Sequence, residues 1–140
     1  MTTEQKKLLK GHLKAALGHQ PEIKILRKLL LRIGGEELVA RPDREVPLLV
    51  EYGFVMAGPV MTKPMEPGDC HGNLARLWRN KRSQLAGIGT GYTLGNDGLW
   101  RQHSWGVKRE GILETTEERL KYFGILLQGP LADAFAAGNV

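Results

Sequence analysis

The sequence predicts an α+β fold, in which an N-terminal helical hairpin precedes a cysteine-bearing helix packed on a small antiparallel sheet. Apolar residues recur at helical spacing over the first part of the chain, and short strand-like segments divided by turn residues follow residue 85. Between them, a polar, glycine-containing segment leads into a further helical pattern at Cys70. The length of 140 residues suits one domain, in which 1–35 form the hairpin and 66–127 form the core that carries the candidate site.

The hairpin is predicted from two helical patterns, over residues 3–17 and from Pro21 to Ile33. A proline is well tolerated in a first helical turn, where its missing N–H costs nothing. Gly18 ends the first helix and Gly34-Gly35 end the second. We expect these apolar side chains to be buried against the rest of the domain: Leu9, Leu13, Leu26, Leu30 and Ile33.

The positive charge of the chain is concentrated in this hairpin. Residues 1–32 contain eight Lys or Arg and two Glu, a net charge of +6, whereas the remaining residues carry a net −1. A basic amphipathic helix can bind nucleic acid or an anionic membrane. Because both helices also have an apolar stripe that must be buried, we interpret the lysines as a solvated face and do not expect a nucleic-acid partner.

The central connection over residues 36–66 is predicted to be irregular, because prolines interrupt it repeatedly. Within it, residues 48–56 fit a short strand or a helical turn equally well. Four strands follow, over residues 85–94, 99–107, 112–115 and 122–127. The sequence Gly-Asn-Asp-Gly at 95–98 favours a tight turn between the first two, and a weak helix is expected at 131–137.

The composition excludes several classes of protein. Charged residues make up 25% of the chain, and no segment approaches the ~18 consecutive apolar residues of a membrane span. The N-terminal residues lack the apolar stretch of a signal peptide, and a single cysteine cannot form an internal disulfide. We therefore expect a cytoplasmic protein without a membrane partner; the sequence does not predict its oligomeric state.

The single cysteine, Cys70, is the most informative residue. It lies between small or polar neighbours, from Pro67 to Asn73, at the start of a predicted helix. The N-terminus of a helix lowers the pKa of a thiol and favours its reactive thiolate form. We therefore interpret Cys70 as a nucleophile, while a buried structural cysteine and a metal ligand are the alternatives.

A base and an orienting acid follow Cys70 in the sequence. His103 lies within a predicted strand, on the same face as Trp105, and Glu114 lies on the next strand. A histidine can accept the thiol proton, and a carboxylate can orient the imidazole. Glu114 could equally be a solvent-facing strand residue or part of a helix-capping pattern at 115–118.

Other residues are weaker candidates. Asn73, Trp105 and Tyr52 are predicted to bind substrate or to support the site. His71 is a poor base for Cys70, because consecutive helical residues project about 100° apart. A zinc site made of Cys70, His71 and His103 would have only three ligands at an unusual spacing, so we expect neither a metal nor another cofactor.

The order of these residues resembles that of the papain-like and transglutaminase-like cysteine fold. Cys70, then His103-Ser104-Trp105, then Glu114-Thr115 resemble the family's cysteine, His-x-Trp and Asp-x-Thr, over residues 66–127. Two departures are that the acid is Glu rather than Asp, and that no upstream oxyanion glutamine is found.

This resemblance implies a cysteine hydrolase or acyltransferase: a peptidase, an amidase or a transglutaminase-like enzyme. A peptide or amide substrate would form a thioester on Cys70, and water or an amine would accept the acyl group. The alternative hypothesis is a non-catalytic interaction module that binds a protein through its aromatic strand or its basic helices. Nucleic-acid binding by those helices is a weaker third hypothesis.

Overall fold

A computed structural model describes residues 1–80 and 84–139 and confirms the α+β class. The described part holds five helices and a seven-stranded sheet. The helices are α1 (Thr3–His19), α2 (Ile23–Ile33), α3 (Val46–Tyr52), α4 (Cys70–Asn80) and α5 (Pro130–Gly138). Among the described residues, no helix combines the length and the apolar character needed to cross a membrane.

The four long strands pair antiparallel, as predicted, and so does one short outer strand, but the two other short strands pair in parallel. The four long strands are β4 (Gly87–Leu94), β5 (Leu99–Lys108), β6 (Gly111–Glu114) and β7 (Lys121–Leu127). Three short strands join them: β1 (Glu37–Leu38), β2 (Phe54–Met56) and β3 (Val60–Thr62). The strand order is β2-β7-β4-β5-β6-β3, with β1 beside β5.

The α+β class thus holds, but the sheet is not the small antiparallel one that the sequence predicted. Strand β1 pairs with β5 in parallel, and β3 pairs with β6 in parallel, so the sheet is mixed. All three short strands come from the proline-rich connection at 36–66. Strands of two or three residues are too short to show an alternating pattern, which is why sequence periodicity did not reveal them. The segment 48–56 contributes both α3 and β2.

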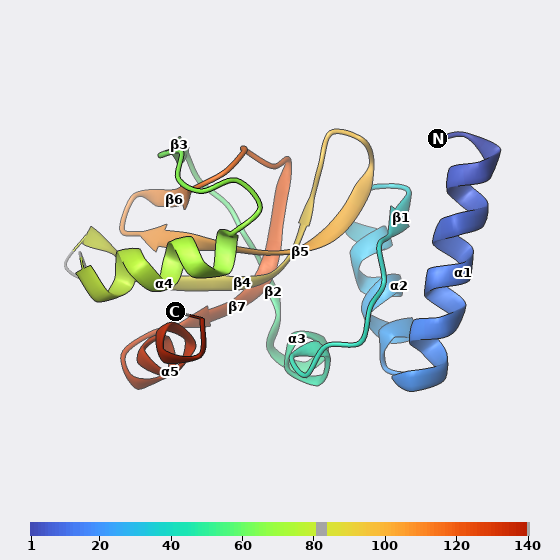
Figure 1. Ribbon diagram of the computed structural model, residues 1–140, viewed down its shortest axis with the longest axis horizontal. Coiled ribbons are helices and arrows are strands. Elements are labelled where there is room, and N and C mark those ends of the chain that lie inside the picture. The colour runs from blue at the N-terminus through green and yellow to red at the C-terminus, as the bar shows by residue number, and fades with distance from the viewer. Residues whose placement is uncertain (81–83, 140) are drawn as a thin grey trace.

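The helices form two groups on different parts of the sheet (Figure 1). Helices α2 and α3 pack with α1 around one core cluster that includes Trp100 and Phe123. Helices α4 and α5 pack around a second cluster that includes Leu74 and Ile88. The tight turn predicted between β4 and β5 is present, and Gly98 adopts a φ of 84° there, which favours glycine.

The N-terminal hairpin packs more loosely than predicted. Leu26 and Leu30 of α2 are fully buried, but the predicted core residues Leu9, Leu13 and Ile33 are only half-buried. Helix α1 lies outside α2 (Figure 1), and Ala16 is the buried residue of this helix. It also continues past Gly18 to His19. The expectation of a solvated basic face is met by Lys6, Lys7, Lys10 and Lys14, which are exposed.

Strand β5 pairs with β4 along one edge, and its opposite edge, here called the outer edge, is only partly paired. The interruption of this pairing positions the site. Its first residues, Leu99 and Trp100, pair with β1, and residues 106–108 pair with β6. Between these two pairings, β5 has no strand neighbour on its outer edge within the described part of the chain. Helix α4 begins beside this interruption.

Candidate active site

Cys70 is the first residue of α4, and its half-buried sulfur lies at the interrupted edge of β5. The helix begins here because the N–H of Asn73 donates to the carbonyl of Asp69 (2.8 Å). The backbone N–H groups of His71 and Ser104 both donate to the Cys70 sulfur. One donor belongs to the first turn of α4 and the other to β5, so the sulfur bridges the helix and the strand.

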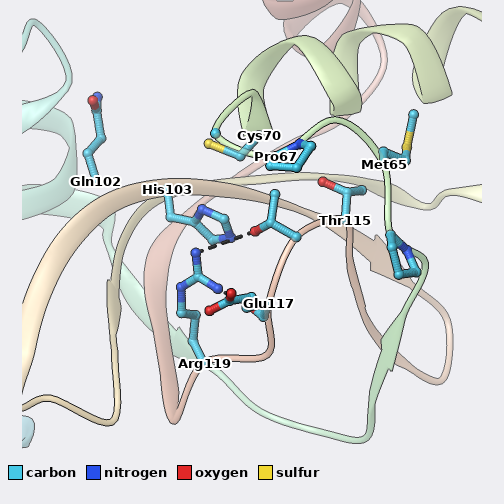
Figure 2. A pocket seen from close by; sticks show the side chains of 11 residues that line it. Met65, Pro67, Cys70, Gln102, His103, Thr115, Glu117 and Arg119 are labelled. Atoms are coloured by element: carbon cyan, nitrogen blue, oxygen red, sulfur yellow. Dashed lines mark hydrogen bonds between the residues drawn. The ribbon is translucent and has the colours of Figure 1, made fainter.

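His103 lies between the cysteine and the acid. Its side chain is 3% exposed, and its Nε2 lies 2.8 Å from Oε1 and 3.1 Å from Oε2 of Glu114. The imidazole also forms a side-chain hydrogen bond with Cys70. Because Nε2 is engaged by Glu114, Nδ1 is the nitrogen left for the thiol. Figure 2 shows Cys70 and His103 together in the wall of a cavity.

Glu114 is fully buried at the end of β6 and accepts hydrogen bonds from three residues. Besides His103, the hydroxyl of Tyr122 donates to Oε1 (2.9 Å), and the N–H and hydroxyl of Thr116 donate to Oε2 (2.9 and 3.0 Å). A buried carboxylate needs such partners, since an unpaired buried charge is very costly. The sequence alternative of a solvent-facing Glu114 is therefore wrong.

The three side chains shift one another's pKa toward charged forms. Burial raises the pKa of the Cys70 thiol, but the His103 hydrogen bond and charge and the two backbone N–H groups outweigh it, leaving the pKa below its ordinary value. Burial lowers the pKa of His103, yet its bonds to Cys70 and Glu114 raise it overall. Burial raises the pKa of Glu114, but His103 and the other donors lower it overall. The geometry thus favours a thiolate beside an imidazolium.

Trp105 supports the histidine from inside the domain. It is fully buried, its ring stacks at 6.3 Å from that of His103, and it meets Tyr122 edge-on at 5.1 Å. Its indole lies directly on Gly89 of β4, where an added Cβ would come within 2.2 Å of the indole nitrogen. Trp105 is not among the residues that line the cavity, so its position suits support rather than substrate binding.

Asn73 is also a supporting residue. It is fully buried, and its amide nitrogen donates to the carbonyl of Glu66 (2.9 Å) and to Oγ1 of Thr115 (3.2 Å). Its amide oxygen accepts from Arg76 (2.6 Å). These bonds tie the loop before α4 to the residue that follows Glu114, and so hold the cysteine and the acid in register.

Tyr52 was predicted to serve the site and lies outside it. It is 62% exposed at the end of α3 and does not line the cavity. The chain continues from it through Gly53 into β2, and β7 and β4 separate β2 from β5. The residues of this segment show no hydrophobic period from which its distance from His103 could be inferred.

His71 points to a different partner. Its Nδ1 lies 2.5 Å from Oγ of Ser104, consistent with the expectation that it is a poor base for the adjacent cysteine. Burial lowers the pKa of His71, which favours its neutral form. Over residues 1–80 and 84–139, no three His, Cys, Asp or Glu side chains gather in a group that could hold a metal ion.

The cavity beside Cys70 has a volume of about 460 Å³. One wall is the loop that contains Pro64, Met65, Pro67 and Gly68, and the other is the segment after β6. The second wall contributes Thr115, Thr116, Glu117 and Arg119. Sequence reasoning missed Thr116, Arg119 and Tyr122, since only the position of Glu114 in space makes them neighbours of the site.

No protein-family model, no curated protein and no solved structure matches this chain. The case for a function therefore depends on the geometry of the site and on the order of its residues in the sequence.

Proposed function

We propose that the protein is a cysteine-nucleophile acyl-transfer enzyme that acts on a peptide or amide. The observation that carries this proposal is that Cys70 and His103 interact in the wall of a cavity, while Glu114, buried behind them, holds the far nitrogen of His103. A nucleophile, a base and an orienting group at hydrogen-bond distance are the arrangement that covalent catalysis requires. The resemblance to the papain-like and transglutaminase-like fold, in the order cysteine, histidine, acid, supports the same proposal.

The proposed reaction has two halves. The Cys70 thiolate attacks the substrate carbonyl, and Nδ1–H of His103 then protonates the leaving amine as the thioester forms. Water or an amine next attacks the thioester, loses its proton to His103 and releases the thiolate. Glu114 keeps Nδ1 of His103 directed at the sulfur throughout, because it holds Nε2. A backbone N–H in the first turn of α4 would donate to the carbonyl oxygen as it gains negative charge.

A reducing compartment would keep the thiol available for this chemistry, and the cytoplasmic location expected from the sequence is part of the proposal.

The thiolate can be tested by alkylation. A thiol with an ordinary pKa of about 8.5 is only about 0.3% thiolate at pH 6. We expect Cys70 to react with iodoacetamide at pH 6 at least about tenfold faster than a model thiol, and His103→Ala to remove this advantage. His12→Ala, on an exposed position of α1, is the matched control and should leave the rate unchanged.

The thioester can be tested separately by mass spectrometry. The protein should release a burst of nitrophenolate from p-nitrophenyl acetate and carry one acetyl group on Cys70, and Cys70→Ser should show neither.

The alkylation experiment can contradict the proposal. A thiol that reacts only above pH 8, or an alkylation rate that does not change in His103→Ala, would show that Cys70 is not an activated nucleophile and would favour the interaction-module alternative.

A further inference from the structure

We propose that Arg119 makes this cavity selective for acyl donors that carry a carboxylate near the bond to be cleaved. The inference takes the reaction from the proposed function, but the recognition itself can be tested on the thiol whether or not the thiol is activated. Arg119 lies on the same cavity as Cys70 and His103, on the wall formed by the segment after β6 (Figure 2).

The guanidinium of Arg119 contacts only neutral oxygens. It donates to Oγ1 of Thr116 (3.4 Å) and to the backbone carbonyl of Glu117. Within the described residues, no carboxylate lies within ion-pair distance of it, whereas three other arginines are each paired with a carboxylate. Those pairs are Arg27–Glu37, Arg76–Asp69 and Arg101–Asp97. A guanidinium has five N–H donors, so donors of Arg119 are left for a ligand in the cavity.

The hydroxyl groups of Thr116 and Tyr122, which bind Glu114, also hold Arg119 in position. The Thr116 hydroxyl accepts from Arg119 and donates to Glu114 (3.0 Å). The backbone N–H of Arg119 donates to the hydroxyl of Tyr122 (3.1 Å), which itself donates to Glu114 (2.9 Å). A half-buried cation held in this way is preorganised, which lowers the entropic cost of binding an anion.

The charge around the cavity indicates which anion fits. Among the described residues that line it, Arg119 is the only Lys or Arg. The other ionisable neighbour on this wall is Glu117, whose side chain is exposed. One planar guanidinium matches one planar carboxylate of charge −1 through two parallel hydrogen bonds. A phosphate monoester carries a charge of about −1.5 to −2 and would be neutralised less completely.

Paired alkylating agents test this inference without a known substrate. N-chloroacetylglycine carries a carboxylate, and N-chloroacetylglycinamide is its neutral counterpart; both react with Cys70 through the same chloromethyl carbon. The thiolate sulfur displaces chloride, so a C–S bond forms as the C–Cl bond breaks. The measured quantity is the alkylation rate with the carboxylate reagent divided by the rate with the neutral reagent. It is measured at pH 8.5, where any accessible thiol is substantially ionised.

We expect this ratio to fall about tenfold in Arg119→Gln, because the charge-assisted hydrogen bonds to the carboxylate are lost. Arg119→Lys, which keeps the charge but not the planar fork, should give an intermediate ratio. Arg109→Gln removes the same charge from an exposed position in the turn after β5 and should leave the ratio within twofold of the wild type.

A second measurement uses the unaltered protein. N-acetylglycine should slow the alkylation of Cys70 by the neutral reagent, and N-acetylglycinamide should not. An unchanged ratio in Arg119→Gln, or equal protection by the acid and the amide, would overturn the inference. Because the ratio is read at pH 8.5, it can support carboxylate recognition even if the rate at pH 6 shows an ordinary thiol and the proposed reaction fails.

Discussion

Replacing Glu114 with glutamine should lower the reactivity of the Cys70 thiol while leaving the fold in place. Oε2 of Glu114 accepts from the backbone N–H of Thr116, which can only donate, so the glutamine oxygen must take this position. The amide nitrogen then lies where Oε1 contacts Nε2 of His103 and the hydroxyl of Tyr122. An amide N–H at the shorter contact with Nε2 favours that nitrogen as an acceptor over donation to the more distant oxygen, and so favours the neutral Nδ1–H tautomer. In that tautomer His103 can no longer accept the proton of Cys70.

The magnitude follows from the bonds that change. Hydrogen bonds to a charged group contribute about 1.5–3 kcal/mol, and neutral ones about 0.5–1.5 kcal/mol. Relief from burying a carboxylate offsets part of the difference, so we expect Glu114→Gln to lower the free energy of unfolding by only about 1–3 kcal/mol. The alkylation rate of Cys70 at pH 6 should fall by at least about tenfold, since the imidazolium that stabilises the thiolate is lost.

The pH dependence of stability gives an independent reading of the same substitution. The folded-state pKa of Glu114 lies below its ordinary value, so its contribution to stability is present above the unfolded-state pKa, about 4.3. That contribution is lost as the pH falls through the folded-state pKa. Glu114→Gln should therefore flatten the acid limb of a plot of unfolding free energy against pH.

The assay combines urea unfolding between pH 3 and 7 with iodoacetamide kinetics on the same preparations. Glu118→Gln, on an exposed position of the same segment, is the matched control and should change neither measurement. A Glu114→Gln protein that alkylates at the wild-type rate at pH 6 would refute the reasoning, because Glu114 would then have no influence on the proton of His103.

Two further predictions concern residues that hold the site and the domain together. Asn73→Ala should cost about 1–3 kcal/mol in urea unfolding, since the buried hydroxyl of Thr115 loses its donor and the loop at Glu66 loses a hydrogen bond. It should also slow alkylation of Cys70, and the exposed Asn80→Ala should do neither. Deleting residues 1–33 should unfold or aggregate the protein. Ile23, Leu26 and Leu30 are at most 1% exposed, and burial of each side chain contributes about 1.5–3 kcal/mol to the stability of the fold. A truncated chain that stays folded and loses only affinity for a polyanion would contradict this prediction.

The sequence predicted what depends on local pattern. The strands β4 to β7, the turn at 95–98 and the start of a helix at Cys70 all follow from spacing and turn residues, and they appear in the structure within a few residues. The spacing also predicted that Cys70, His103 and Glu114 belong together, and the structure brings them into contact. Their catalytic roles stay predictions that the alkylation and thioester experiments test.

What the sequence could not predict depends on pairing between distant segments. The parallel partners β1 and β3 lie in a segment without a period, so neither the mixed sheet nor the distance of Tyr52 from the site could be inferred. Leu9 and Leu13 are less buried than predicted, because an amphipathic stripe shows which face of a helix is covered but not what fraction of each side chain is buried. Arg119 lies in a short polar segment without a motif, and its place beside the site follows only from the three-dimensional position of Glu114.

The interrupted edge of β5 explains why the site forms where it does. The N–H of Val39 donates to the carbonyl of Trp100 (2.9 Å), which places the backbone groups of Trp100 on the outer edge of β5. Backbone groups alternate sides along an antiparallel strand, so those of Gln102 and Ser104 point to the same edge. A continuous neighbouring strand would occupy the N–H of Ser104. Because the pairing changes from β1 to β6 at this point, that N–H is available to the Cys70 sulfur, and helix α4 can dock with Cys70 beside the strand that carries His103.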